Sequence, residues 1–135
     1  MATVIIDIDH CLADAFHRDE LIGQWDAYHA ASDKDQPIHA IVRLVEALHG
    51  ANFNIVAITG RPEKWRQLTM SWLLRHDIPV DELLMRPDKN FEPAPQLKVK
   101  LSQQLNEEIL FVIDNRDDVI AAFKALGIMA LQVHA

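Results

Sequence analysis

Two aspartates, Asp7 and Asp9, close the first apolar run of the sequence. Residues 3–7 form a β-branched run that ends in a carboxylate, which predicts a buried strand. In extended backbone, side chains two residues apart point the same way. Two carboxylates in one space repel each other, and a divalent cation would let one ionise as a nucleophile while the other serves as a general acid. Alone, the Asp-x-Asp pattern also fits a solvated turn.

Polar residues also follow two later apolar runs. Thr59 and Gly60 come after the run at 53–58, just before a helical pattern, where a hydroxyl and backbone N–H groups can hold a phosphate. The alternative there is an ordinary Thr-Gly turn. Asp114 ends the run at 109–113 and could complete a site for a hard cation together with Asp7.

A phosphate beside a carboxylate needs a positive group to offset the charge. Lys98, in the first turns of a predicted helix, is our candidate, and Lys89 and Lys100 compete with it. A single lysine on an amphipathic helix is more often solvated, so Lys98 gains its weight from the neighbouring motifs.

Strand-like and helix-like patterns alternate along the whole chain. The expected strands are residues 3–7, 53–58, 83–85, 109–113 and 128–133, and the expected helices cover about 21–28, 37–50, 62–73, 95–105 and 119–126. This alternation predicts a mainly parallel sheet with helices on both faces, a three-layer α/β fold of the Rossmann-like type. Ligands of such sheets bind beyond the carboxyl ends of the strands, where Asp7, Thr59 and Asp114 all fall.

Length and composition indicate one domain, residues 1–135, with no disulfide. The chain has 135 residues, a net charge of −7 and a single cysteine, Cys11. No apolar run approaches the roughly 20 residues of a membrane span, so we expect no membrane association and a cytoplasmic location. The acidic balance opposes broad attraction to nucleic acid, so a polyanionic substrate would have to be held locally.

The order of these motifs resembles the haloacid dehalogenase (HAD) superfamily of phosphotransferases. The residues that carry the resemblance are Asp7-Ile8-Asp9-His10-Cys11-Leu12, Thr59-Gly60-Arg61, Lys98 and Asp114-Asn115. More closely, the chain looks like the phosphatase half of phage polynucleotide kinase-phosphatase, which places an arginine eleven residues after the first motif, here Arg18, and has a Met-Arg element, here Met85-Arg86.

The resemblance implies a HAD-like fold with little or no cap and a two-step phosphatase mechanism. Asp7 would attack phosphorus, and Asp9 would protonate the leaving oxygen and later activate water. Mg²⁺ would be held by Asp7, the backbone carbonyl of Asp9 and Asp114, while Thr59 and Lys98 bind the phosphoryl oxygens. The further implication is that substrate contacts beyond the reacting group come from the arginines Arg18, Arg61 and Arg86.

The sequence departs from the HAD pattern at three positions. His10 replaces the usual glycine, Cys11 the usual threonine, and Asn115 the usual second aspartate of the last motif. Histidine restricts backbone that glycine would leave free. Asn115 removes a negative charge near the expected cation.

Other functional classes fit less well. Six residues separate Cys11 from Arg18, one more than in a cysteine-phosphatase loop, so we expect Cys11 to be a packing residue. A receiver-type signalling module would have its acidic pair after the first strand and its phosphorylated aspartate at a middle strand, where this chain has Thr59. A catalytically silent domain stays open because of His10 and Asn115.

Without a lid the site should be open, which suits the end of a polymer better than a small metabolite. With the resemblance, we predict hydrolysis of phosphate monoesters at nucleic-acid 3′ ends, and a phosphatase of free nucleotides is the alternative. Trp25 near the site could serve either packing or base stacking.

Overall fold

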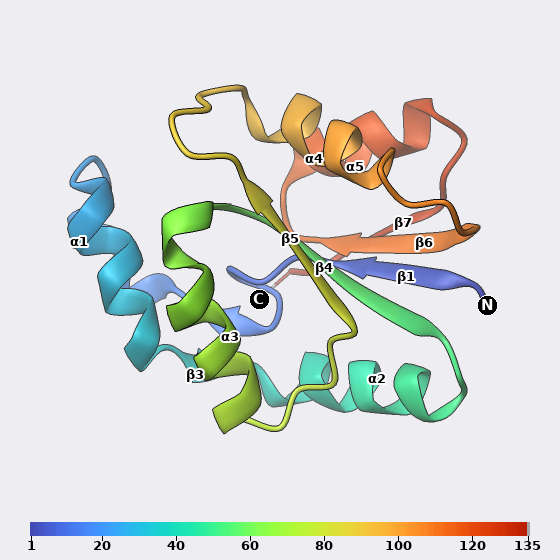
Figure 1. Cartoon of the computed structure of the whole chain (residues 1–135), viewed down its shortest axis with the longest axis horizontal. Coiled ribbons are helices and arrows are strands. Elements are labelled where there is room, and N and C mark those ends of the chain that lie inside the picture. Colours follow the sequence, from blue (N-terminus) through green and yellow to red (C-terminus); the bar gives the residue numbers. More distant parts are fainter. Residues whose placement is uncertain (135) are drawn as a thin grey trace.

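The computed structural model describes residues 1–134 and contains a five-stranded parallel sheet in the order β5-β4-β1-β6-β7 (Figure 1). The strands are β1 (Thr3–Ile6), β4 (Asn54–Pro62), β5 (Glu82–Arg86), β6 (Ile109–Asp114) and β7 (Ala130–Gln132). The central strand β1 is buried along its whole length, because both of its faces are covered by helices. It pairs with β4 on one side and β6 on the other, so Ile5 lies opposite Val56 and Val112.

Helices on both faces complete three layers, as the sequence predicts. They are α2 (His39–Gly50), α3 (Arg66–Arg75), α4 (Ala94–Ser102) and α5 (Asp117–Ala125). Alternate residues of β1 enter two separate cores: Val4 and Ile6 pack with Trp72 of α3, whereas Ile5 packs with Leu97 of α4 and Phe123 of α5. The predicted three-layer α/β fold is therefore confirmed.

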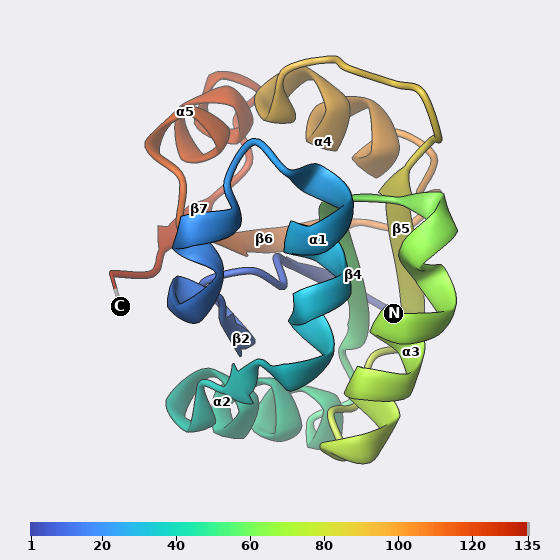
Figure 2. The same cartoon turned by 90° about the vertical axis from the view of Figure 1, so that its left-hand side faces the viewer.

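The segment between β1 and α2 differs from the prediction of a helix at 21–28. It contains β2 (Ala13–Asp14), the 3₁₀ helices η1 (Phe16–Leu21) and η2 (Ala31–Lys34), the short helix α1 (Trp25–Ala30) between them, and β3 (Gln36–Pro37). The helical pattern is broken at Gly23, whose φ of 97° is favourable only for glycine. Ile22 and Trp25 are therefore exposed. Figure 2 shows this segment in front of the sheet, and its short turns agree with the expected small or absent cap.

Strand β4 is longer than predicted. It continues through Thr59 and Gly60 to Pro62, with an irregularity in its pairing to β5 between Thr59 and Pro62. The 3₁₀ turn η3 (Glu63–Trp65) then leads into α3. This irregular strand end brings the backbone of Gly60 to the edge where β1 and β6 also end. Across the described residues, every helix is too short or too polar to cross a membrane.

Candidate active site

A pocket of about 480 Å³ lies at the carboxyl ends of the strands and contains five of the predicted site residues. Its lining includes Asp7, Asp9, Gly60, Arg86 and Lys98. The other four predicted residues are almost completely buried around it: Thr59, Asp114, Arg18 and Arg61. The fold therefore gathers residues from the two ends of the chain into one region, as the topology predicts.

The first group of charges is the Asp7 cluster, formed by Asp7, Lys98 and Asp114. The ammonium of Lys98 on α4 lies 2.9 Å from Oδ1 of Asp7 and donates a hydrogen bond of 2.6 Å to Oδ2 of Asp114. All three side chains are buried. The carboxylate of Asp114 is also held by the backbone, because its Oδ1 accepts a hydrogen bond of 3.0 Å from the N–H of Arg116. Two carboxylates thus converge on one cation.

Burial dominates the electrostatics of Asp7. It raises the pKa of Asp7 to about 7, since the attraction of Lys98 only partly offsets desolvation and the repulsion of Asp114 and Asp9. For Lys98, burial would lower the pKa, but the two carboxylates outweigh it and the pKa rises above its ordinary value. The cluster consequently holds an ammonium that stays charged and a carboxyl that is protonated below neutral pH.

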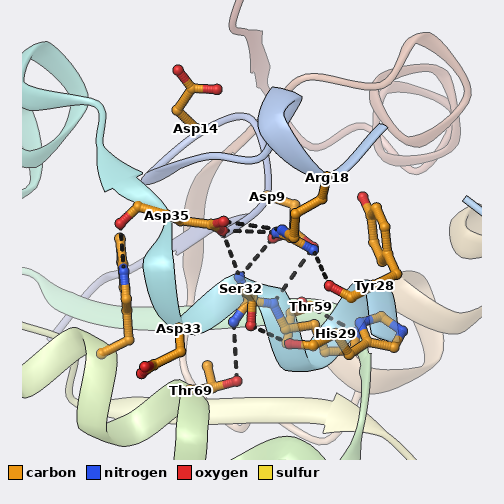
Figure 3. Close-up of polar contacts among 12 residues, drawn as sticks. Asp9, Asp14, Arg18, Tyr28, His29, Ser32, Asp33, Asp35, Thr59 and Thr69 are labelled. Carbon is orange, nitrogen blue, oxygen red and sulfur yellow. Dashed lines mark hydrogen bonds and ion pairs between the residues drawn. The ribbon is translucent and has the colours of Figure 1, made fainter. Parts of the chain in front are cut away.

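The second group is the Asp9 cluster, formed by Asp9, Arg18, Arg61 and Asp35. Figure 3 shows Asp9, Arg18 and Asp35 pointing toward one another. One oxygen of Asp9, Oδ1, accepts hydrogen bonds from Arg18 at 2.7 Å and from Arg61 at 2.6 Å. Arg61 also donates to the hydroxyl of Thr69 at 3.1 Å. Burial would raise the pKa of Asp9, but the charges and hydrogen bonds of Arg61 and Arg18 hold that pKa well below its ordinary value. Asp9 is therefore a carboxylate in the free protein.

The sequence matches a known protein family along its whole length. The whole chain, residues 1–135, matches the family model described as the polynucleotide kinase PNKP phosphatase domain. The chain belongs to this family. It is therefore a HAD-type phosphatase domain, in agreement with the motifs at Asp7, Thr59, Lys98 and Asp114.

Solved structures show the same fold. The chain resembles one in the structure of the Pnkp1/Rnl/Hen1 complex with a TM-score of 0.86 and 22% identity, covering 98% of this chain and 45% of that one. A chain in the structure of the Pnkp1/Rnl/Hen1 RNA repair complex has a TM-score of 0.87 and 21% identity, and the match covers 98% of this chain and 42% of that one. The class C acid phosphatase of Bacillus anthracis has a TM-score of 0.67 and 13% identity, and the match covers 93% of this chain and 61% of that one. This PNKP-type domain thus spans less than half the length of the first two chains. Functionally characterised protein sequences give no significant match.

Two of the arginines expected to contact substrate lie instead behind Asp9 in this PNKP-type domain. Arg18 and Arg61 are 0% and 1% exposed, and their guanidinium groups are occupied by carboxylates. In the free protein both arginines thus bind carboxylates, and their contact with substrate stays a prediction. The arginines turn inward because the charge of Asp9, which lies inside the site, would otherwise have no positive partner.

Asp35 is a site residue that the sequence analysis missed. Its side chain is fully buried and accepts two hydrogen bonds from Arg18, at 3.0 and 2.7 Å, and a contact of 2.6 Å from Nε2 of His17. Its backbone carbonyl accepts the indole N–H of Trp72 at 2.9 Å. The sequence places Asp35 in a polar turn before a proline, and nothing there distinguishes it from its exposed neighbour Asp33.

Arg86 connects two backbone segments at the edge of the pocket. It lines the pocket, but its guanidinium donates to the carbonyl of Gly60 at 2.9 Å and to the carbonyl of Glu92 at 2.7 Å. Arg86 thus ties the end of β4 to the loop between β5 and α4. Thr59 is buried, and its hydroxyl accepts the backbone N–H of Arg61 at 3.2 Å, so it shapes the turn below the pocket.

The three departures from the HAD pattern have clear positions. His10 has a φ of 63°, in the region where glycine is favoured, and its ring packs on Phe16 at 4.5 Å. Cys11 is buried, and burial raises the pKa of its thiol far above the ordinary value, which fits a packing role. Asn115 lines the pocket beside Arg116.

Proposed function

We propose that this domain is a magnesium-dependent phosphomonoesterase that carries the phosphoryl group on Asp7. The observation that supports it most directly is the Asp7 cluster, in which a buried carboxyl on the pocket wall shares one ammonium with Asp114. Such a site offers a nucleophile and a fixed positive charge to a phosphate in a place shielded from water. Phosphoryl transfer depends chiefly on this positioning and charge neutralisation.

In the first step, an oxygen of Asp7 forms a bond to phosphorus while the bond from phosphorus to the ester oxygen breaks. Lys98 stabilises the negative charge on the phosphoryl oxygens. The departing oxygen takes a proton from Asp9. The resting Asp9 is ionised, so the proton has to reach it with the substrate, whose negative charge raises the pKa of a nearby carboxyl.

In the second step, water replaces Asp7 on phosphorus. Asp9 accepts a proton from that water as its oxygen bonds to phosphorus, and the bond between phosphorus and Asp7 breaks to release phosphate. The two arginines favour the ionised form of Asp9, which is the form that a general base requires.

The donors present fit Mg²⁺. The side chains of Asp7 and Asp114 already converge on a cation, and the backbone carbonyl of Asp9 is the third protein oxygen that the family pattern offers. Within residues 1–134 no group of three metal-binding side chains occurs. Mg²⁺ is commonly held by one or two carboxylates together with waters and substrate phosphates. When bound, Mg²⁺ would neutralise charge on the phosphoryl group.

For the substrate, we propose the 3′-phosphate end of a nucleic acid. The support is the PNKP phosphatase family and the likeness to chains whose structures are described as an RNA repair complex. A phosphatase of free nucleotides is the competing proposal, since the pocket is large enough for one nucleotide.

One experiment tests both the chemistry and the substrate. Phosphate release with Mg²⁺ is compared for a 3′-phosphorylated oligonucleotide, a 5′-phosphorylated one and free nucleotides, and labelled protein is sought after acid quenching. We expect fastest release from the 3′ end and a label that hydroxylamine removes, as an acyl phosphate requires. Equal or faster release from nucleotides would reject the polymer substrate, and a protein without label at any quench time would reject the covalent step.

A further inference from the structure

Two exposed aromatic side chains from different elements line the active-site pocket. Trp25 of α1 is 55% exposed and Phe91, in the loop between β5 and α4, is 91% exposed, and both line the pocket that contains Asp7 and Lys98. In Figure 1, α1 and this loop both project beyond the carboxyl ends of the strands. Aromatic side chains that line a pocket are typical of sites that bind small organic ligands.

Neither ring is exposed through a loose local structure. Trp25 packs edge-on against Tyr28, with ring centroids 5.4 Å apart, and nearly parallel to His29 at 6.2 Å. Phe91 lies between Asn90 and Glu92, whose carbonyl oxygens both accept hydrogen bonds from Arg86. The fold thus holds the ring of Trp25 and the backbone on either side of Phe91 in place, while both side chains stay exposed.

The wall next to Trp25 contains an unused polar group. His29 also lines the pocket and is 9% exposed, and Nδ1 of its ring is itself buried and has no hydrogen-bond partner among the described residues. Burial lowers the pKa of His29 to about 4, so the ring is neutral and keeps one donor and one acceptor nitrogen at pH 7. A neutral imidazole beside an indole face suits a planar ring that carries hydrogen-bonding edges.

We propose that Trp25, His29 and Phe91 form a base subsite, which binds the nucleobase of the nucleotide whose phosphate lies at Asp7. The base stacks on Trp25 beside the neutral ring of His29, and Phe91, from the loop between β5 and α4, covers it as well. The proposal rests on the phosphatase function proposed above and names the part of the substrate that the outer pocket recognises. Stacking on aromatic side chains tolerates any base, so the subsite accepts different sequences.

The test uses two substrates that differ only by the base: an oligonucleotide with a 3′-phosphate and the same molecule with an abasic terminal residue. The readout is the ratio of their kcat/KM values. For the wild type we expect the base to raise kcat/KM about tenfold or more. Trp25→Ala should reduce this ratio toward one, and Phe91→Ala should reduce it partly. Leu74→Ala, at an exposed residue of α3 outside the pocket lining, is the matched control and should keep the wild-type ratio.

The outcomes separate the two proposals. A wild-type protein that hydrolyses both substrates equally would overturn the base subsite and leave the phosphatase intact. A ratio that survives both Trp25→Ala and Phe91→Ala would also overturn it, and would point to a partner protein that covers these two side chains. No release from either substrate, or from glycerol phosphate, would overturn the proposed function itself. Because Phe91 is almost fully exposed, its substitution cannot report loss of folding in place of loss of binding.

Discussion

The two charge clusters of the site lie side by side but are built on opposite principles. In the Asp7 cluster, two buried carboxylates share one ammonium, so one negative charge is in excess when both are ionised. In the Asp9 cluster, two carboxylates face two guanidinium groups, and their formal charges cancel. Burial raises the pKa of Asp7, whereas the arginines hold the pKa of Asp9 well below its ordinary value.

This difference separates the roles of two aspartates that are only two residues apart. The Asp7 cluster has two carboxylates for the single positive charge of Lys98, which leaves it able to bind a further cation together with a phosphate. The Asp9 cluster is complete without any ligand and therefore holds its carboxylate in a fixed place. Two titratable groups with pKa values pushed apart are the usual basis for assigning distinct catalytic roles. The following predictions test whether the two clusters really act differently.

The largest effect should come from the nucleophile. Asp7→Asn removes the oxygen that bonds to phosphorus, and we expect kcat to fall by at least about 10³-fold. Phosphate release from an aryl phosphate measures it, with Asp14→Asn, at an exposed carboxylate outside the pocket, as the control. Residual activity within tenfold of the wild type would show that Asp7 is not the nucleophile.

The pH profile should report the charge deficit of the Asp7 cluster. Because burial raises the pKa of Asp7 to about 7, the carboxyl is protonated below that pH and cannot attack. At low Mg²⁺, kcat/KM should therefore rise about tenfold per pH unit up to about pH 7 and then level, a range of about 100-fold from pH 5. High Mg²⁺ favours the carboxylate and should move the inflection to lower pH. If the inflection stays at the same pH at every Mg²⁺ concentration, Asp7 does not bind the cation.

Asp35→Asn tests whether the Asp9 cluster must be electrically complete. The buried Arg18 loses its bidentate partner, so we expect a loss of about 3 kcal/mol in the free energy of unfolding and about tenfold in kcat. Urea unfolding and steady-state rates measure these effects. The control Asp33→Asn breaks an exposed pair with Arg75 and should cost less than about 1 kcal/mol. Equal effects of the two variants would contradict a special role for Asp35.

Asn115→Asp should have the smallest effect and acts on the first cluster. It adds a carboxylate near Asp7 and Asp114, which increases attraction for a divalent cation. We expect the Mg²⁺ concentration for half-maximal activity to fall a few-fold, because each added carboxylate strengthens a hard-cation site. A titration of activity with Mg²⁺ measures it. A half-maximal Mg²⁺ concentration below that of the wild type fits this expectation. An unchanged or higher value would place the cation away from Asn115.

The Asp7 cluster could be anticipated from the sequence because it follows from one rule of topology. Apolar runs that end in Asp7 and Asp114 indicate parallel strands, and parallel strands bring their carboxyl ends to one edge. The helix with Lys98 packs on the same sheet. The helix predicted at 21–28 is confirmed only from Trp25 onward, because Gly23 breaks it and the apolar residues Ile22, Trp25 and Tyr28 line the pocket.

The sequence by itself determined the strands, the three-layer fold and the edge at which the acidic residues meet, since these depend on local periodicity and on the handedness of strand connections. Only the tertiary structure decided that Arg18 and Arg61 turn inward to Asp9 and that Asp35 belongs to the site. A charged residue looks the same in a sequence whether water or another charge surrounds it. Its role is set by which distant residues exclude the water, and that depends on packing across the whole fold.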